Sequence, residues 1–264
     1  MDVFRPSNLD EALRVRAEHP DARPIQGGTD VMVELNFGHS RPPALLDLSE
    51  VAELRGWSED DGSLRLGAAL TYTEAMASPL AGLLPALAEA SRTVGSPQIR
   101  NRGTIGGNLG TASPAGDALP PLLAGRAEVE LASVRGSRVL PLDEFLLGVK
   151  RTALGPDELV TAVRARPSGG AQTFMKVGPR NAMVIAICSL AVVVDTEAGE
   201  ARAAFGSAAV TARRVTVPLA DAAALPERLA EAASPIDDVR ATAAYRRHAL
   251  RVLTGRALER CLRS

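Results

Sequence analysis

Two hydrophobic periods alternate along this chain and predict a mixture of helices and strands. Apolar residues spaced by three and four are typical of one helix face, and strict alternation is typical of a half-buried strand. Helices are predicted over residues 9–13, 30–37, 71–94, 142–147 and 238–260. Strands are predicted over residues 22–26, 44–48, 63–70, 129–133, 138–140, 158–165, 173–177, 185–195 and 201–209. The pattern therefore indicates an α+β protein.

The N-terminal elements have start and stop signals that predict a β–α–β unit. Ser7 or Asn8 can cap the first helix. Gly27-Gly28 breaks the strand over 22–26, and Thr29 or Asp30 can cap the following helix, which should run through Phe37. That helix is expected to face inward with three apolar residues: Val31, Met32 and Leu35.

A glycine-rich stretch over residues 100–121 has neither hydrophobic period, which predicts a long loop. Loops of this length inside a domain are uncommon unless they are functional. Glycines allow backbone N–H groups to approach a ligand, and successive N–H groups can form an anion-binding concavity. Residues 24–31 repeat the Gly-Gly-polar chemistry before a predicted helix start, where phosphate binds favourably. The two stretches suit the paired phosphates of a dinucleotide, although a lone Gly-Gly is also typical of a plain strand–turn–helix corner.

The last third of the chain differs from the rest. Residues 166–172 (RPSGGAQ) read as a linker or domain boundary, and the three strands beyond it precede an alanine-rich helical region. The final helix has one apolar face, formed by Leu250, Leu253, Ala257 and Cys261. This region is predicted to be a small antiparallel sheet followed by helices.

Composition narrows the class of partner. The chain has 264 residues, 46% hydrophobic and 23% charged, with a formal net charge of −1. Such a balance gives no electrostatic case for nucleic acid or an anionic membrane surface, and an aromatic content of 3% weakens base stacking. The opening residues lack a signal-peptide pattern, and the longest apolar run, 182–194, is too short to span a membrane. A cytoplasmic location is expected.

The residue types exclude several kinds of chemistry. Cys188 and Cys261 are the two cysteines, too few to ligate an iron–sulfur cluster or a structural zinc ion. The three histidines have no metal-like spacing, and no nucleophile or Walker motif is present. No catalytic side chain and no metal ligand is therefore assigned, and a bound organic cofactor is left to carry the chemistry.

Several polar residues could contact such a cofactor. Thr29, Thr104 and Thr111 can donate hydroxyl hydrogen bonds to phosphate, and Asn108 can both donate and accept at a flavin edge or a ribityl hydroxyl. Asp117 would repel phosphate, so it should accept from hydroxyls or a ring N–H, or else cap its turn. Lys176 could present a positive charge to the cofactor, or lie solvated at a strand end.

Three motifs together carry a family resemblance. Gln26-Gly-Gly-Thr-Asp30, Gln98-Ile-Arg-Asn-Arg-Gly-Thr-Ile-Gly-Gly-Asn108 and Ser113-Pro-Ala-Gly-Asp117 resemble the FAD-binding medium subunit of molybdenum hydroxylases. This is the xanthine dehydrogenase and carbon monoxide dehydrogenase flavoprotein family. Weaker matches in the same order extend the resemblance over nearly the whole chain.

The resemblance implies a fold and a set of cofactor contacts. It implies a PCMH-type FAD-binding domain over residues 1–166, with α/β subdomains at about 1–55 and 56–166, and a C-terminal α+β domain over 167–264. The pyrophosphate cradle would comprise Pro24, Ile25, Gln26, Gly27, Gly28, Thr29, Asp30 and Val31, with Thr104, Ile105, Gly106, Gly107 and Asn108. Further FAD contacts would come from Val94, Asp117, Val160 and Lys176. Thr29-Asp30 replaces the His-Ser pair typical of carbon monoxide dehydrogenases, which argues for another substrate.

By the same resemblance, the chain would relay electrons as one oxidoreductase subunit. A molybdopterin-binding large subunit and a 2Fe-2S iron–sulfur subunit would be its partners, in a dimer of heterotrimers, and FAD would pass electrons to NAD, oxygen or quinone. One alternative is a stand-alone flavin oxidase or reductase of the wider superfamily. Another is a binding module that has lost FAD, against which the intact glycines argue.

Overall fold

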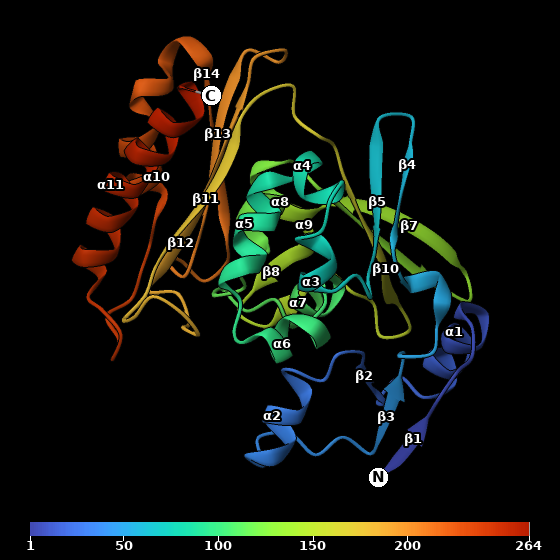
Figure 1. Ribbon diagram of the computed structural model, residues 1–264. Coiled ribbons are helices and arrows are strands. Elements are labelled where there is room, and N and C mark those ends of the chain that lie inside the picture. The colour runs from blue at the N-terminus through green and yellow to red at the C-terminus, as the bar shows by residue number, and fades with distance from the viewer. Residues whose placement is uncertain (264) are drawn as a thin grey trace.

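The computed structural model describes residues 1–263 and has an α+β architecture (Figure 1). The N-terminal part holds a parallel sheet of order β1-β3-β2. Its elements are β1 (Asp2–Phe4), α1 (Leu9–Glu18), β2 (Arg23–Ile25), α2 (Val31–Asn36), β3 (Ala44–Asp47) and the short 3-10 helix η1 (Ala52–Leu54). The predicted β–α–β unit is confirmed, and β1 adds a strand that the pattern did not predict.

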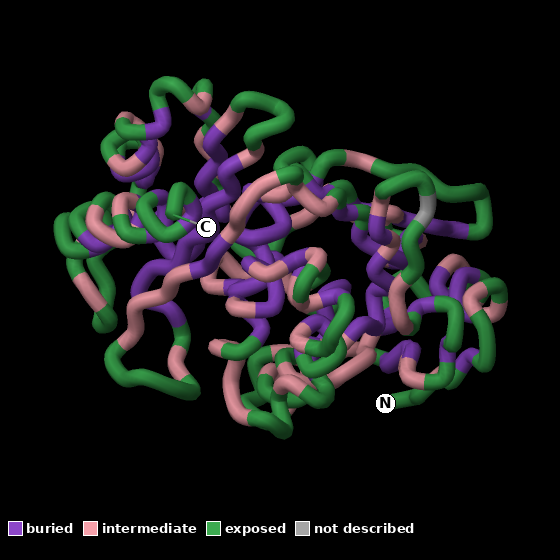
Figure 2. The backbone as a smooth tube through the Cα atoms, turned by 45° about the horizontal axis from the view of Figure 1, so that its top comes forward, coloured by how far each residue is buried: buried purple, intermediate pink, exposed green. Residues whose placement is uncertain are grey.

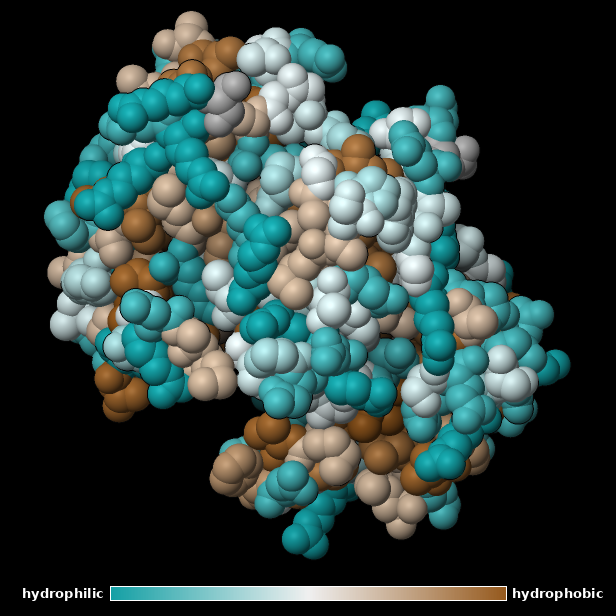
Figure 3. All heavy atoms as spheres, viewed as in Figure 1, coloured by the Kyte–Doolittle hydropathy of each residue, from teal (hydrophilic) through white to brown (hydrophobic). Residues whose placement is uncertain are grey.

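The two N-terminal helices differ in how they pack. Asn8 caps α1 as predicted, because its side chain accepts a hydrogen bond from the Glu11 N–H. The predicted inward face of α2 is wrong, since none of its residues is buried and Met32 is 44% exposed. Figure 3 shows apolar atoms on the surface around α2 at the lower end of the molecule, where Val33 and Phe37 are also exposed. A six-residue helix beside a three-stranded sheet has little core to face.

A five-stranded antiparallel sheet of order β4-β5-β10-β6-β7 forms the central part. Its strands are β4 (Trp57–Asp60), β5 (Ser63–Gly67), β6 (Glu128–Ser133), β7 (Gly136–Pro141) and β10 (Leu159–Ala165). A two-stranded ribbon lies beside it, made of β8 (Leu146–Gly148) and β9 (Arg151–Thr152). The other elements here are α3 (Tyr72–Ala75), α4 (Leu80–Leu83), α5 (Pro85–Thr93) and α9 (Leu142–Phe145). The predicted capping box at Thr71 and Glu74 is confirmed.

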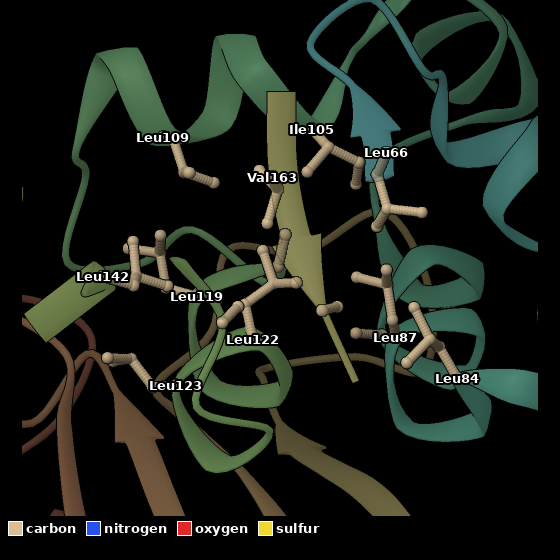
Figure 4. Close-up of a cluster of buried hydrophobic side chains, with 14 of the residues drawn as sticks. Leu66, Leu84, Leu87, Ile105, Leu109, Leu119, Leu122, Leu123, Leu142 and Val163 are labelled. Carbon is tan, nitrogen blue, oxygen red and sulfur yellow. The ribbon is translucent and has the colours of Figure 1, made fainter. Parts of the chain in front are cut away.

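The glycine-rich stretch is not the predicted loop. It contains the second half of α6 (Pro97–Arg102), all of α7 (Ile105–Thr111) and the start of α8 (Leu119–Ala124). In Figure 4, Ile105 and Leu109 point from α7 into the core near Val163 of β10. These two residues lie four apart, so they share one helix face, which is a sparse helical signal hidden among glycines. Pro120 lies in the first turn of α8, where its missing N–H is not needed.

The C-terminal part is an antiparallel sheet of order β11-β12-β13-β14. Its strands are β11 (Gln172–Val177), β12 (Cys188–Asp195), β13 (Glu200–Gly206) and β14 (Arg213–Pro218), followed by the 3-10 helix η2 (Leu219–Ala224), α10 (Leu225–Ala232) and α11 (Ala243–Leu262). α10 and α11 cover one face of the sheet, and α5 and α8 pack on the other (Figure 1). Consequently β12 and β13 are almost wholly buried (Figure 2). The predicted apolar face of the last helix is confirmed at Leu250, Ala257 and Cys261.

Polar contacts join the C-terminal sheet to the central helices. The guanidinium groups of Arg202 and Arg214 donate to the carbonyls of Ala124 and Leu123 at the end of α8. Glu89 of α5 accepts hydrogen bonds from the Thr173 hydroxyl and the Phe174 N–H, each at 2.7 Å. One hydrophobic cluster spans both parts, so the division into domains stays a prediction. Within residues 1–263 no helix has the length and hydropathy needed to cross a membrane.

Candidate functional site

A cavity of about 350 Å³ lies where the N-terminal part meets α6 and α7. Both glycine-rich stretches contribute to its wall. Fifteen of the predicted cofactor contacts line it: Pro24, Ile25, Gln26, Gly27, Gly28, Thr29, Asp30, Val31, Val94, Thr104, Gly106, Gly107, Asn108, Thr111 and Val160. Three do not line it: Ile105, Asp117 and Lys176. The fold therefore brings together two segments that are about 80 residues apart in sequence.

The first glycine turn is fixed by its contact with the second stretch. A Cβ atom on Gly27 would overlap the carbonyl oxygen of Arg102, so only glycine allows the two backbones to approach this closely. Gly28 has a φ of +75°, a left-handed conformation that L-residues rarely adopt. Gly27 thus joins the two segments, and Gly28 turns the chain from β2 into α2.

The backbone of the first turn is open to a ligand. No acceptor in the described part of the chain takes the N–H groups of Gly27, Gly28, Thr29 or Asp30. Successive unpaired N–H groups of this kind form a concavity that suits phosphate oxygens. The unpaired N–H groups of this turn agree with the anion-binding concavity that the sequence predicts.

The second stretch is built differently. The N–H of Ile105 donates to the Leu70 carbonyl, the N–H of Gly106 to the Ala68 carbonyl, and the N–H of Gly107 to Thr104 Oγ1 at 3.0 Å. Thr104 is therefore the N-cap of α7. Two glycines of α7 leave space for a ligand because they have no side chain. A Cβ on Gly107 would meet only Thr104 Oγ1, and one on Gly110 would meet nothing within 4 Å. A ligand can therefore lie against α7, although the first N–H groups of this helix are already hydrogen-bonded within the protein.

One hydrogen bond joins the two stretches, and a second polar contact ties α2 to the turn between β8 and β9. Thr111 Oγ1 donates to Asp30 Oδ2 at 2.8 Å, and Lys150 Nζ lies 2.7 Å from Glu34 Oε1 of α2. The Thr111 hydroxyl hydrogen is thus directed at a carboxylate in this structure. The Lys150 bond holds the pKa of Glu34 below its usual range.

Two buried acceptors in the wall lack donors. Gln26 Oε1 and Asn108 Oδ1 are buried and make no hydrogen bond to the described residues. Both residues line the cavity. Leaving a buried acceptor unpaired is costly, so these oxygens fit a ligand that carries hydroxyl or amine hydrogens. FAD carries both, together with the phosphates that the first turn suits.

Asp117 and Lys176 form a buried ion pair outside the cavity wall. Lys176 Nζ lies 2.6 Å from Asp117 Oδ2 and 3.3 Å from the Thr93 carbonyl oxygen. Burial raises the pKa of Asp117, and the charge of Lys176 acts against this rise. The reading of Lys176 as a solvated strand end is wrong, because its side chain is buried. The pair fixes Thr93, whose neighbour Val94 lines the cavity, and a direct contact of either residue with FAD stays a prediction.

Several wall residues were not predicted from sequence. They include Arg16, Arg23, Leu54, Tyr72, Ile99, Gly110 and Leu159. Gly110 could have been found, because it follows Gly107 at helical spacing. Burial raises the pKa of the Tyr72 hydroxyl, with the negative charge of Asp117 adding to the effect. Arg16 gives no sequence signal, since an arginine in the last turn of a helix is ordinary.

The described residues form no metal site, and the two cysteines lie outside the cavity. Among the described residues, no group of three or more His, Cys, Asp and Glu side chains could hold a metal ion. Cys188 and Cys261 are both buried in the C-terminal core, where burial raises the pKa of the thiols to about 12 and about 11. Cys188 is therefore a small buried hydrophobic residue.

The fold and the cavity define an FAD-binding protein of the molybdenum hydroxylases. The model of the family described as "FAD binding domain in molybdopterin dehydrogenase" matches residues 1–165, and the chain belongs to this family. FAD is its cofactor. The protein is an oxidoreductase subunit, as the resemblance implied.

Individual relatives match most of the chain. The xanthine dehydrogenase FAD-binding subunit of Escherichia coli O157:H7 is 32% identical over 96% of this chain and 93% of its own length. The nicotinate dehydrogenase FAD-subunit of Eubacterium barkeri is 37% identical over 74% and 69%. Among solved structures, a chain of carbon monoxide dehydrogenase from Hydrogenophaga pseudoflava has a TM-score of 0.91 at 26% identity, covering 99% and 97%.

Proposed function

We propose that this chain is the electron relay of a molybdenum hydroxylase, with FAD carried in the cavity between α2 and α7. Electrons would arrive from a 2Fe-2S partner subunit, after substrate oxidation on a molybdopterin-binding subunit, and leave to NAD, oxygen or quinone. The bound FAD supplies the redox chemistry. The residues of this chain hold and orient it.

The observation that carries this proposal is the combination of ionisable groups in the wall. They are Arg16, Arg23, Asp30 and Tyr72. Asp30 is engaged by Thr111, and the Tyr72 pKa is raised so that its hydroxyl stays protonated. Such a wall offers a poor acid–base set for a substrate, whereas unpaired amides and acceptors suit cofactor binding. This supports a relay over a stand-alone oxidase or reductase.

The relatives support the proposed partners. Their names describe FAD subunits of xanthine and nicotinate dehydrogenases, and the solved carbon monoxide dehydrogenase is a form that lacks the Mo-pyranopterin moiety of its molybdenum cofactor. The proposal therefore includes an assembly with iron–sulfur and molybdopterin chains, as a dimer of heterotrimers. A cytoplasmic location is part of the same proposal.

Reduction in the presence and absence of partners tests the relay. The FAD-loaded chain should keep its flavin absorbance when a purine or pyridine substrate is added alone. The absorbance should bleach when chains purified with it, carrying iron–sulfur and molybdopterin groups, are also present. Bleaching by substrate without any partner would instead indicate a stand-alone enzyme. Reoxidation of the reduced complex by NAD, oxygen and quinone in separate mixings then identifies the acceptor.

A further inference from the structure

Arg16 in the last turn of α1 is a buried cation with an unused donor. Its side chain is 8% exposed, and Nη1 donates to the carbonyls of Pro20 and Ala22 at 2.9 and 2.8 Å. Nε is buried and has no hydrogen-bond partner among the described residues. No carboxylate of the described chain lies within ion-pair distance of it, in contrast to Arg23, which pairs with Glu34. Arg16 also lines the cavity, so the residue that carries this unused donor borders the ligand space.

The position of Arg16 places it away from the phosphates. Its guanidinium is tied to Ala22, and Gly27 follows five residues later through the extended strand β2. The three residues of β2 span about 10 Å. The Ala22 carbonyl and the amides of Gly27 to Asp30 thus lie at opposite ends of β2, which places Arg16 nearer one end of the dinucleotide than its pyrophosphate.

The two ends of the cavity differ in how closed they are. Leu48, Leu54 and Leu159 line the cavity and are buried in one hydrophobic cluster with Ala12 and Leu13 of α1, the helix that carries Arg16. Val94 and Ile99 also line the cavity, and Ile99 is 37% exposed. A flavin that exchanges electrons with partners needs the accessible end, which leaves the closed end for adenine. This step rests on the relay function proposed above.

We propose that Arg16 recognises adenine: its Nε–H donates to a ring nitrogen of the adenine half of FAD and thereby favours the dinucleotide over FMN. Adenine ring nitrogens are hydrogen-bond acceptors, and the leucines beside Arg16 supply apolar contact for the ring. FMN has the same flavin and one phosphate but no group that reaches this end. Arg16 thus acts as a specificity residue of the cofactor site.

Ligand titrations of the apoprotein test this assignment. Arg16→Lys keeps a cation near the Pro20 and Ala22 carbonyls and removes the Nε donor. It should weaken binding of FAD and of ADP by about tenfold or more, the effect of losing one charge-assisted hydrogen bond, and leave FMN affinity within about twofold. Arg14→Lys, an exposed arginine on the same helix, should change none of the three affinities.

Two outcomes overturn the proposal. If Arg16→Lys lowers the affinities for FAD, ADP and FMN equally, Arg16 only positions β2. If the FAD and ADP affinities are unchanged, the Nε donor of Arg16 is not used in binding. If Arg16→Lys does not fold, the Arg16 Nε–H resonance of the wild-type chain decides, because it should shift on addition of ADP and not of FMN. No shift at saturating ADP overturns the assignment. These measurements need no electron transfer, so their failure is separate from failure of the relay.

Discussion

Gly110 presents a bare backbone to the cavity, and this makes it the cleanest single position at which to test the cofactor site. A Cβ there meets no protein atom within 4 Å, so a larger side chain enters ligand space without disturbing the core. Gly110→Leu should lower FAD affinity by tenfold or more, measured by quenching of flavin fluorescence, with little change in the unfolding of the apoprotein.

Gly82 in α4 is a matched control for this change. It is also a helical glycine with nothing within 4 Å of an added Cβ, and it does not line the cavity. Gly82→Leu should leave FAD affinity unchanged. Full FAD affinity in Gly110→Leu would contradict the placement of the cofactor against α7.

Lys176 and Lys150 allow a comparison between a buried and an exposed ion pair. Lys176 lies 2.6 Å from Asp117 and is buried, whereas Lys150 lies 2.7 Å from Glu34 and is 60% exposed. Lys176→Met leaves a buried carboxylate without a partner, which should cost about 3–5 kcal/mol of unfolding free energy in urea. Lys150→Met should cost about 1 kcal/mol or less. Similar losses in the two variants would show that the Asp117 pair gains nothing from burial.

At the scale of elements, Glu130 on β6 ties three strands of the central sheet. It accepts hydrogen bonds from Arg65 of β5 and from Thr161 and Arg164 of β10. Burial alone would raise the pKa of Glu130, but the bonds from Arg65, Thr161 and Arg164 outweigh it and lower that pKa to about 2. The carboxylate should therefore stabilise the sheet at neutral pH.

The pH dependence of Glu130→Gln follows from that shift. A lowered pKa means that the stabilisation is complete above the unfolded value near 4.5 and is lost as the pH falls towards 2. The variant should be about 1–2 kcal/mol less stable than the wild type at pH 7, and the difference should shrink between pH 4.5 and 2. Glu128→Gln, exposed on the same strand, is the control in these urea titrations. A difference that persists at pH 2 would count against a role for the charge.

Elements with a strong period could be predicted from sequence, and those set by distant contacts could not. The final helix and the buried strands follow from spacing alone. α7 was missed because glycines hide its period, and only Ile105 and Leu109 mark it. The exposure of α2 was missed because apolar spacing does not show whether a neighbour exists to cover it.

The same limit applies to the site. Local motifs identify the glycine turns, because phosphate chemistry needs glycines at adjacent positions. Arg16, Leu54 and Leu159 line the cavity from three different elements, and no local sequence motif marks any of them as a cavity residue. The Asp117–Lys176 pair likewise joins residues 59 apart in sequence, which no spacing argument could place together.

For the whole molecule, the C-terminal sheet is expected to be part of what keeps the FAD-binding part folded. Phe174, Ala191 and Val193 of this sheet belong to the same buried cluster as α5 and α8. Arg202 and Arg214 also bond the last carbonyls of α8, and the Ala124 carbonyl has no other donor among the described residues. A chain ending at residue 166 would expose this apolar surface to water.

We therefore expect residues 1–166 alone to unfold without a sharp transition and to bind a hydrophobic dye. The full chain should unfold cooperatively in the same thermal scan. A sharp transition in the shorter chain, with full FAD affinity, would show that residues 1–166 fold stably without the C-terminal part.

The glycine content of α7 has a thermodynamic consequence. Three glycines in seven residues each cost about 1 kcal/mol of helix stability relative to alanine, so this helix has little intrinsic tendency to form. Ile105 and Leu109 anchor it from the core side, and in the proposed site the cofactor would cover its other side. Folding of α7 and occupancy of the site are then linked equilibria, and a ligand at 100 times its Kd adds about 2.7 kcal/mol to the folded form. In hydrogen exchange, the amides of α7 should be among the first to lose protection when FAD is removed, so this segment reports how much cofactor the protein carries.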